Sequence, residues 1–396
     1  MADKIKLGII GIGNMGSAHA KAIALEGKCP EIELVAVADT NPDRLKWAKE
    51  TLPESVVCFD DAAEMLDSGL IDSCLVAVPH YSHPLYAMEC FKRDIHVMVE
   101  KPAGVHTKHV KEMIEASKKT DATFAMMFNQ RTNCVYRKMR EMIQSGKYGQ
   151  IKRTNWIITN WYRPQIYYDS GAWRATWAGE GGGVLLNQCP HQLDLWQWIC
   201  GMPIKVDAKL HFGKWHDIEV EDDVTAYVEY ANGATGVFIT STGDDPGTNR
   251  FEVLLEKAKI ICEGGKLTLY ELPISETEFR TQCTSAFGCQ KPTVTTVETD
   301  GENPQHVGVL NAFAAHILRG EPLVAGGEEG INGLTISNAM HLSAWLGKTI
   351  DLPFDDDLYY NELMKRVATS KHKENVKEIV SDTSNSYQDR WTKNAN

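Results

Sequence analysis

Short apolar segments alternate with amphipathic segments between residues 4 and 127, and this alternation restricts the fold more than any other feature of the sequence. The amphipathic segments include 15–26, 42–51, 83–93 and 108–120, and the apolar ones are 6–10, 33–38, 56–59, 73–78, 96–100 and 123–128. Nearly continuous apolar strands separated by helices are typical of a parallel sheet buried on both faces. We therefore expect an α/β fold with a doubly wound parallel sheet here.

The pattern changes after Arg131, where longer segments alternate polar and apolar residues. They cover 151–160, 223–230, 234–242, 250–262 and 266–271. Asn-Gly at 232–233 and Gly-Gly at 264–265 mark hairpin turns. These features predict an antiparallel sheet with helices on one face, and helical patterns return at 307–319 and 330–347. The polar tail from about residue 371 is expected to wrap around the molecule or to fray.

A glycine-rich turn follows the first predicted strand. Gly11, Gly13 and Gly16 form GxGxxG directly after a strand and at the start of a helix, which is the context of a dinucleotide-binding turn. The first glycine allows a tight turn, the second lets the backbone approach a pyrophosphate, and the third lets helix and strand pack closely. Asn14 and Met15 begin that helix, whose unpaired N–H groups face the phosphates, so we expect them to contact the cofactor.

The end of the second predicted strand favours NAD over NADP. Asp39 stands at its tip, where a carboxylate can accept a hydrogen bond from the adenosine ribose and would repel a 2′-phosphate. Arg44 follows shortly after and leaves some room for NADP. The other interpretation of this region is a cluster of turn glycines with an Asp that caps a helix.

Composition restricts the partners and the compartment. The net charge of −12, from 41 basic and 53 acidic residues, disfavours nucleic acid and anionic membranes as main partners. No apolar run is long enough to span a bilayer, and the N-terminus leads directly into a strand, so we expect a cytoplasmic protein. The ten cysteines form no CxxC pair and indicate reduced thiols rather than a zinc site.

Two further stretches carry polar residues suited to chemistry. Glu100-Lys101-Pro102 follows the fifth predicted strand, at the sheet edge where ligands bind in such folds, although alone it could be a charged surface turn. Residues 181–198, GGGVLLNQCPHQLDLWQW, are predicted to run into a helix that places Asn187, His191 and Asp194 on neighbouring faces. By itself His191 could be a base or a buried core histidine, and we disfavour a metal site built from it with Asp194 and Cys189.

These motifs occur in a fixed order that resembles the glucose-fructose oxidoreductase / inositol dehydrogenase / MocA (Gfo/Idh/MocA) family over about residues 4–355. They are GxGxxG, VPHYSH at 78–83, EKP at 100–102, FNQR at 128–131, GGG…NxxxH at 181–191 and the segment 330–353. The resemblance implies a Rossmann domain, which we place at 1–128, and a substrate-binding and oligomerisation domain at 129–396 with a large, open, mostly antiparallel sheet. The C-terminal helices are free to pack back on the first domain.

The resemblance also implies a mechanism. His191 would take the proton from a secondary hydroxyl, Lys101 would polarise its oxygen, and a hydride would leave the same carbon for NAD. Lys101 would contact both substrate and cofactor, and Pro102 would fix the turn, often with a cis bond. The nicotinamide half of the cofactor would be lined by Pro79, His80, His83, Glu100 and Asn129.

Asn187 departs from the pattern of many polyol dehydrogenases in the family, which carry Asp four residues before the histidine. An amide cannot take a proton or hold a charge at neutral pH, so we expect Asn187 to orient substrate, and an inositol dehydrogenase is disfavoured. Asp194 either orients the imidazole of His191 or makes a structural hydrogen bond.

The segment 156–177 contains seven aromatic residues and resembles the family's loop beside the substrate site. We expect two or three of these rings to reach the pocket and the others to pack in the core, with Trp173, Arg163 and Arg174 as substrate contacts. The whole chain looks most like the sugar and glycoside 3-oxidoreductases, which act on glucosides including C-glucosides such as puerarin.

Three other functions stay open. They are an NAD-dependent enzyme that cleaves glycosides through transient C3 oxidation, an inositol or polyol dehydrogenase, and a sensor without catalysis. NAD either leaves the enzyme between turnovers or stays bound. We expect a homo-oligomer, a dimer or tetramer, formed through the open sheet.

Overall fold

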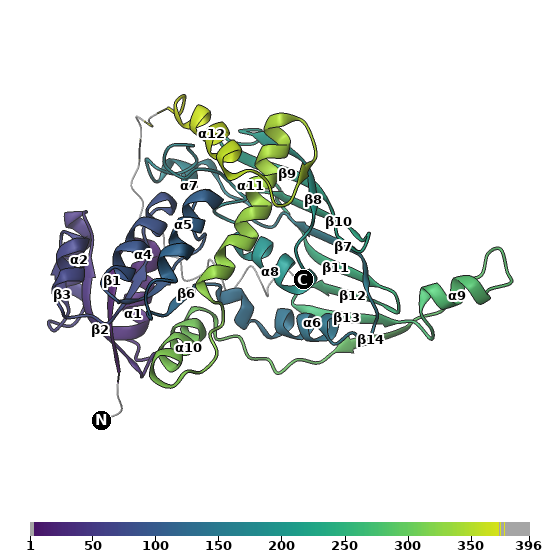
Figure 1. The fold of residues 1–396 in the computed structure, drawn as a ribbon, viewed down its shortest axis with the longest axis horizontal. Helices are drawn as coiled ribbons and strands as arrows, with labels where there is room; N and C mark the ends of the chain where they lie inside the picture. The colour runs from purple at the N-terminus through teal and green to yellow at the C-terminus, as the bar shows by residue number, and fades with distance from the viewer. Residues whose placement is uncertain (1–3, 372, 374–375, 377–396) are drawn as a thin grey trace.

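The computed structural model describes residues 4–371, 373 and 376, and its first part contains a six-stranded, fully parallel sheet (Figure 1). The sheet order is β3-β2-β1-β4-β5-β6. The strands are β1 (Ile5–Ile10), β2 (Ile32–Ala38), β3 (Val57–Phe59), β4 (Ser73–Val76), β5 (His96–Val99) and β6 (Phe124–Met126). The predicted doubly wound sheet is confirmed, and its order reverses between β1 and β4, which opens a crevice at the carboxyl ends of these strands.

Helices cover both faces of this sheet. They are α1 (Asn14–Ala24), α2 (Pro42–Thr51), α3 (Ala62–Asp67), α4 (His83–Phe91) and α5 (Thr107–Ser117). α2 starts where the sequence requires, because the side chain of Asn41 accepts the N–H of Asp43 and Pro42 occupies the first turn. α10 (Gln305–Arg319) also packs here, with Phe313 in one core cluster with Leu7 and Ile23. The boundary between residues 128 and 129 stays a prediction.

The second sheet has nine strands in the order β14-β13-β12-β11-β7-β10-β9-β8-β15. Only the pair β7–β10 is parallel, so the sheet is mostly antiparallel, as expected. The strands are β7 (Ile151–Ile158), β8 (Lys205–Phe212), β9 (Glu221–Glu229), β10 (Thr235–Ser241), β11 (Asn249–Leu255), β12 (Ala258–Glu263), β13 (Lys266–Glu271), β14 (Thr293–Val297) and β15 (Ile350–Asp351).

One predicted strand, 250–262, is wrong in extent. It divides into β11 and β12, which form an antiparallel hairpin. The polar pair Glu256-Lys257 makes the turn without glycine or proline, and it is held from the neighbouring segment, since the N–H of Glu256 donates to the carbonyl of Gln150 and that of Lys257 to the carbonyl of Tyr148. The apolar pattern on either side hides such a turn.

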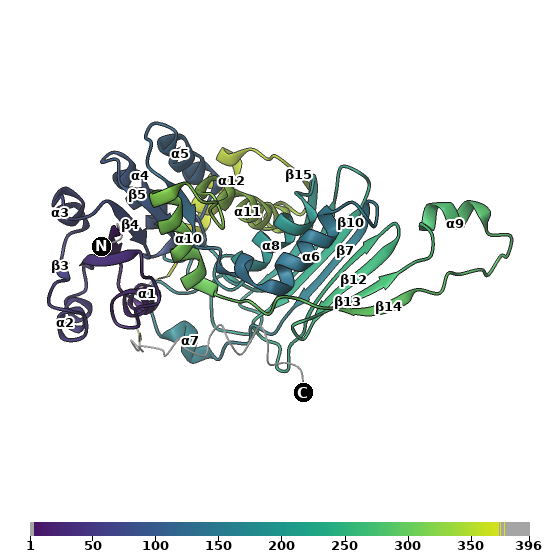
Figure 2. The same cartoon turned by 90° about the horizontal axis from the view of Figure 1, so that it is seen from below.

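Helices cover one face of the second sheet and leave the other open (Figure 2). They are α6 (Cys134–Gln144), α8 (Pro190–Cys200) and α11 (Gly330–Leu346), with α12 (Asp356–Val367) beyond. On the covered face Trp156 stacks on Phe251 with ring centroids 4.2 Å apart. On the open face Ile157 and Tyr227 are 37% and 42% exposed. Apolar side chains therefore reach the surface on the face that no helix covers.

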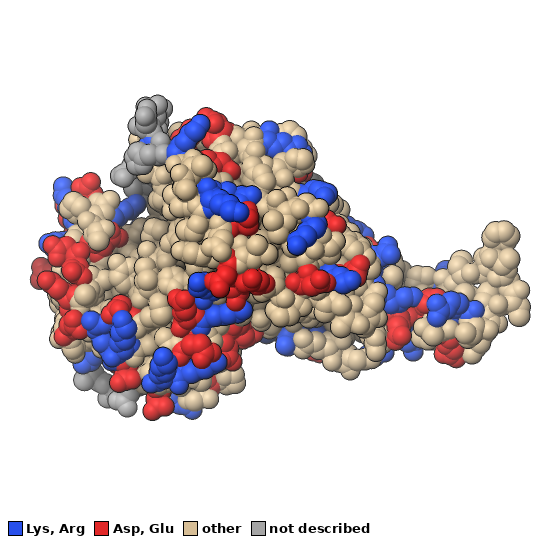
Figure 3. Space-filling model, turned by 45° about the horizontal axis from the view of Figure 1, so that its top comes forward, with Lys and Arg blue, Asp and Glu red and all other residues tan. Residues whose placement is uncertain are grey.

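A long arm between β13 and β14 projects from the edge of this sheet. It carries the short helix α9 (Glu276–Gln282), in which no residue is buried, and Phe287, which is 97% exposed. Figure 3 shows the arm standing clear of the body, with few charged residues at its end.

The helix predicted within 181–198 starts later than expected. α8 begins at Pro190, and residues 184–188 form a turn, so Asn187 precedes the helix and does not share it with His191 and Asp194. Proline is favoured in the first turn of a helix because it needs no N–H partner there. The end of the glycine run is fixed by Glu221, whose carboxylate accepts the N–H groups of Gly183 and Leu185.

The expectation that the polar tail wraps or frays falls on residues that the structure does not describe. Of this tail, only Lys371, Lys373 and Val376 are among the described residues. Within the described part of the chain, no helix combines the length and apolar character needed to cross a membrane.

Candidate active site

The glycine-rich turn is shaped for close approach of a ligand. Gly11 has a φ of +86°, and a Cβ there would lie 2.6 Å from the carbonyl oxygen of Ala77. A Cβ on Gly16 would lie 1.9 Å from the carbonyl oxygen of Gly11, so helix and turn touch at this point. Beside Gly13, in contrast, no atom lies within 4 Å of an added Cβ. The turn thus has open space where a pyrophosphate would meet the N-terminus of α1, and its residues fit NAD.

Asp39 is fixed next to this turn. Its carboxylate accepts the N–H of Ile12 at 2.8 Å and the N–H of Asn41 at 2.9 Å. Each oxygen keeps acceptor capacity for a further hydrogen bond, as a ribose hydroxyl requires. Arg44 lies in the first turn of α2 with its side chain partly buried.

The carboxyl ends of β4 and β5 bring the next predicted residues to the same crevice. Pro79 and His80 follow β4, and Glu100 and Lys101 follow β5. The bond between Lys101 and Pro102 is cis. His83 Nδ1 hydrogen-bonds the carbonyl oxygen of Pro102 at 2.7 Å, which ties the start of α4 to this turn.

Glu100 makes a buried pair with His19 of α1. His19 Nε2 lies 2.7 Å from Glu100 Oε1, and both side chains are almost fully buried. Burial alone would raise the pKa of Glu100, but the hydrogen bond from His19 and nearby positive charge lower it to about 2. The other oxygen, Oε2, accepts the N–H of Lys101, so an ionised carboxylate holds the turn that presents the lysine.

The Lys101 ammonium points across the crevice to the glycine-run segment. Its Nζ donates to the backbone carbonyl oxygen of Asn187 at 3.0 Å. Burial lowers the pKa of Lys101, while the carboxylates of Glu100 and Glu180 act in the opposite direction. A lysine side chain from the first sheet is thereby held against a loop of the second.

His191 lies in the first turn of α8 and is 2% exposed. Its ring packs edge-to-face against Phe128, with ring centroids 6.4 Å apart. Burial, followed by the positive charge of Lys101, lowers the pKa of His191 well below 6.5. The imidazole is therefore neutral at pH 7, the state in which it can accept a proton.

Asp194 has a structural partner. Its two oxygens accept from Arg131 Nε at 2.8 Å and Nη2 at 2.6 Å, and Arg131 Nη1 reaches Glu329 at 2.7 Å. Arg131 and Asp194 are each 1% exposed at the side chain, so this ion pair joins α8 to the segment after β6 inside the protein. Of the two interpretations of Asp194, the structural one fits this geometry.

Part of the aromatic segment lies beside Asn187. The Arg174 guanidinium sits over the ring of Tyr167, 4.6 Å from its centroid, and donates to its hydroxyl at 2.9 Å. Trp173 meets the ring of His80 edge-on at 5.8 Å. Arg163 lies 5.0 Å from the ring centroid of Tyr167. The buried rings of the segment pack inside the protein: Trp156, Trp161, Tyr168 and Trp177.

Asn129 is placed differently from the other expected cofactor contacts. It is fully buried after β6, and its Nδ2 donates to Gln305 Oε1 at 2.6 Å. It thus joins the end of the first sheet to the start of α10.

Three residues near the site were not singled out from the sequence. Glu180 is buried directly before the glycine run, and His19 and His306 meet edge-to-face with ring centroids 5.4 Å apart. Burial is the main cause that lowers the pKa of His306, to about 3. Glu180 follows a segment rich in arginine and aromatic residues, and this position in the sequence could have marked it as a candidate site residue. His19 lies one helical turn after Gly16, and nothing local marks it.

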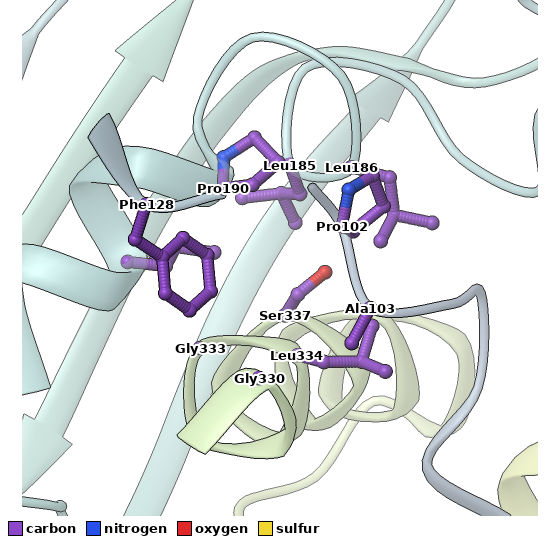
Figure 4. A pocket seen from close by; sticks show the side chains of 11 residues that line it. Pro102, Ala103, Phe128, Leu185, Leu186, Pro190, Gly330, Gly333, Leu334 and Ser337 are labelled. Carbon is purple, nitrogen blue, oxygen red and sulfur yellow. The ribbon is translucent and has the colours of Figure 1, made fainter. Parts of the chain in front are cut away.

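Figure 4 shows a small apolar cavity behind the Lys101–Pro102 turn. Its volume is about 10 Å³, room for one water molecule at most. It lies where that turn, α8 and α11 converge, and Gly330 and Gly333 allow this convergence, since a Cβ on Gly330 would lie 2.8 Å from Ala103 Cβ. The cavity is lined by Pro102, Ala103, Phe128, Leu185, Leu186, Pro190, Leu193, Gly330, Gly333, Leu334 and Ser337. The cavity is a packing defect between the elements that hold the site, and it is too small to bind a substrate or a cofactor.

No group of three His, Cys, Asp or Glu side chains is arranged to hold a metal ion among the residues that the structure describes.

Comparison with known proteins identifies the class. Residues 5–128 match the family described as "Oxidoreductase family, NAD-binding Rossmann fold", and residues 136–261 match the "GFO/IDH/MocA C-terminal domain". The chain belongs to the Gfo/Idh/MocA family; it is an oxidoreductase, and its cofactor is NAD.

Its relatives include myo-inositol 2-dehydrogenase of Thermotoga maritima, 24% identical over 345 residues that cover 85% of this chain and 95% of that protein. D-glucoside 3-dehydrogenase of Escherichia coli is 26% identical over 59% of this chain and 68% of its own length. Among solved structures, the WlbA dehydrogenase of Chromobacterium violaceum, in complex with NADH and UDP-GlcNAcA, is 27% identical with a TM-score of 0.77, over 90% of this chain and 98% of that one.

Proposed function

We propose that the protein oxidises a secondary hydroxyl of a sugar or glycoside, at C3 of a glucosyl unit, to a ketone with NAD. The observation that carries this proposal is the joint placement of a neutral imidazole, His191, and an ammonium, Lys101, at the carboxyl edge of the first sheet. The E. coli relative named D-glucoside 3-dehydrogenase and the NADH complex of WlbA support it.

The two side chains divide the proton work. His191, uncharged at neutral pH, accepts the proton of the reacting hydroxyl. Lys101 donates a hydrogen bond to the same oxygen and stabilises the negative charge that develops there. NAD, when bound, accepts the hydride from the carbon. Asn187 contacts a neighbouring hydroxyl, and Arg163, Trp173 and Arg174 form the wall on which the sugar lies.

A second candidate is glycoside cleavage through transient oxidation at C3, with NAD kept bound between turnovers. A ketone at C3 acidifies the hydrogen at C2, and elimination then needs another base. His80 favours this candidate, because burial lowers its pKa well below 6.5 and its ring lies beside Trp173. An inositol or polyol dehydrogenase is disfavoured by Asn187.

Product analysis tests these proposals. Purified protein is incubated with a panel of glucosides and polyols, with and without added NAD, and products are identified by mass and NMR. A 3-ketoglucoside with its aglycone attached supports the proposal. Released aglycone with unoxidised glucose supports the cleaving enzyme, and oxidation of inositol alone contradicts both.

Asp39 is expected to set the preference for NAD. Asp39→Ser removes the charged acceptor of the ribose hydroxyls and should weaken NADH binding by roughly 10- to 100-fold, the equivalent of about 1.5–3 kcal/mol. NADPH should bind more tightly than to the wild type because its 2′-phosphate no longer meets a carboxylate. Fluorescence titration with both cofactors measures this. An unchanged ratio of the two dissociation constants contradicts the role of Asp39.

We also propose that the protein is a homo-oligomer, a dimer or tetramer of this chain, in the cytoplasm. The uncovered face of the nine-stranded sheet and the arm with the exposed Phe287 support assembly, because isolated elements of this kind bury too little surface to be stable alone. The ten free cysteines suit a reducing compartment. Multi-angle light scattering should give two or four times the chain mass, and a monomer at micromolar concentration contradicts assembly.

A further inference from the structure

Glu180 is a buried carboxylate that the proposed mechanism does not use. It is 2% exposed and lies in the loop just before the glycine run. Its Oε1 accepts a hydrogen bond from Asn187 Nδ2, and its Oε2 accepts the N–H of Ala175 at 2.6 Å. Both oxygens are thus bound on the protein side, which fixes the carboxylate.

The hydrogen bond from Asn187 Nδ2 to Glu180 determines how the amide of Asn187 is oriented, because the Nδ2 end can only donate. With its NH₂ group facing Glu180, the Oδ1 of Asn187 faces the other way and accepts a hydrogen bond from the hydroxyl of Tyr167 at 3.4 Å. Asn187 alone is partly exposed in the segment 181–190, where its neighbours are buried. An amide oxygen has two lone pairs, so Oδ1 can accept a second hydrogen bond beside the one from Tyr167.

The charged groups that interact with Glu180, Arg174 and Lys101, are residues of the candidate active site. Burial raises the pKa of Glu180, and the positive charge of Arg174 is the largest opposing influence. Glu180 in turn acts on Lys101, since Glu180 and Glu100 both raise the pKa of Lys101 against the effect of its burial. Asn187 lies between these groups, since its amide binds Glu180 and its backbone carbonyl oxygen accepts from Lys101 Nζ.

We propose that Glu180 is a positioning residue that sets substrate specificity: it locks the amide of Asn187 so that Oδ1 accepts a hydrogen bond from a substrate hydroxyl next to the one that reacts. The carboxyl group of Glu180 then binds Asn187 and not the substrate, and the sugar contacts the neutral amide oxygen of Asn187. The substrate class is an uncharged sugar or glycoside with two adjacent free hydroxyls. This inference rests on the proposed function.

An exchange of donor and acceptor tests the pair without any substrate. Asn187→Asp places two carboxylates against each other and should lower Tm by about 3 °C, because one of them is forced to take a proton or lose its partner. Adding Glu180→Gln supplies an NH₂ group that faces the new Asp carboxylate, so the double variant should regain most of that Tm. A double variant no more stable than Asn187→Asp overturns the pairing.

Kinetics separate positioning from general stability. Glu180→Gln leaves an amide that can present either end to Asn187, so the orientation is no longer forced. KM for the glucoside should rise about tenfold, as expected for one lost hydrogen bond, with kcat changed much less. Glu219→Gln is the matched control, because Glu219 accepts the N–H of Trp177 in the same loop region and does not contact Asn187. An unchanged KM in Glu180→Gln overturns the specificity role.

The removal of the adjacent hydroxyls gives an independent readout. The wild type should lose about tenfold in kcat/KM with 2-deoxy or 4-deoxy glucosides, whichever lacks the hydroxyl that meets Asn187. Glu180→Gln should discriminate less against that analogue. Equal discrimination in both proteins contradicts the inference. A wild type that oxidises no sugar contradicts the proposed function instead, while the Tm cycle still reports on the pair.

Discussion

Lys101→Met is expected to lower kcat for glucoside oxidation by about 10²- to 10³-fold while the affinity for NADH changes little. The methionine keeps the apolar stem in its buried position but removes the ammonium that lies beside Asn187 and His191. Glu100 keeps its partner His19, so the turn after β5 should stay folded. Stopped-flow measurement of NADH formation gives kcat, and NADH fluorescence gives the dissociation constant.

A charge-preserving variant is the control for this prediction. Lys101→Arg keeps the positive charge but replaces a compact ammonium by a planar guanidinium that is too large to donate from the same point. It should retain NADH binding and recover little of the lost rate. Near wild-type kcat in Lys101→Met shows that the ammonium does not take part in the reaction.

The second large effect is expected from the buried ion pair behind His191. Asp194→Asn leaves the buried guanidinium of Arg131 without its bidentate partner, and the loss of one member of a buried pair costs about 3–5 kcal/mol. Since Asp194 and His191 share α8, kcat/KM should fall as well. The free energy of unfolding is measured by urea titration followed by tryptophan fluorescence.

Glu329→Gln is the matched comparison. Glu329 contacts the same guanidinium, but its side chain is 37% exposed, so its loss should cost about 1 kcal/mol or less. Equal destabilisation by the two variants contradicts the assignment of Asp194 as the structural partner. A loss of activity in Asp194→Asn without loss of stability indicates that Asp194 acts on His191 after all.

The first sheet and its glycine turn were predictable because their signals are local. Alternation of strand and helix fixes the class, and the spacing of Gly11, Gly13 and Gly16 marks a turn that the structure shows with open space at Gly13. A local pattern misleads where it continues across the end of a helix or strand. The hairpin at Glu256-Lys257 has no turn residue, and the start of α8 at Pro190 was masked by the apolar residues before it.

The support of the candidate site was not predictable, because it depends on contacts between distant segments. Arg131 and Asp194 are 63 positions apart, and His19 and Glu100 are 81 apart. Asn187 was recognised as a neutral residue where relatives carry Asp, but its partner Glu180 could be found only once the loop was folded over it. The family resemblance identifies Lys101 and His191 as candidate catalytic residues. The structure adds the contacts that hold them, the hydrogen bonds of the Lys101 turn and the ion pair that anchors α8.

The most direct test of the central claim follows the hydride itself. Methyl β-D-glucoside carrying deuterium at C3 is incubated with the wild-type protein and NAD, and the reduced cofactor and the sugar are analysed by mass spectrometry. The proposed reaction predicts one deuterium in NADH, a 3-keto sugar without the label, and formation of both products about 10²- to 10³-fold more slowly with Lys101→Met. Unlabelled NADH, or a ketone at another carbon with deuterium still at C3, contradicts it.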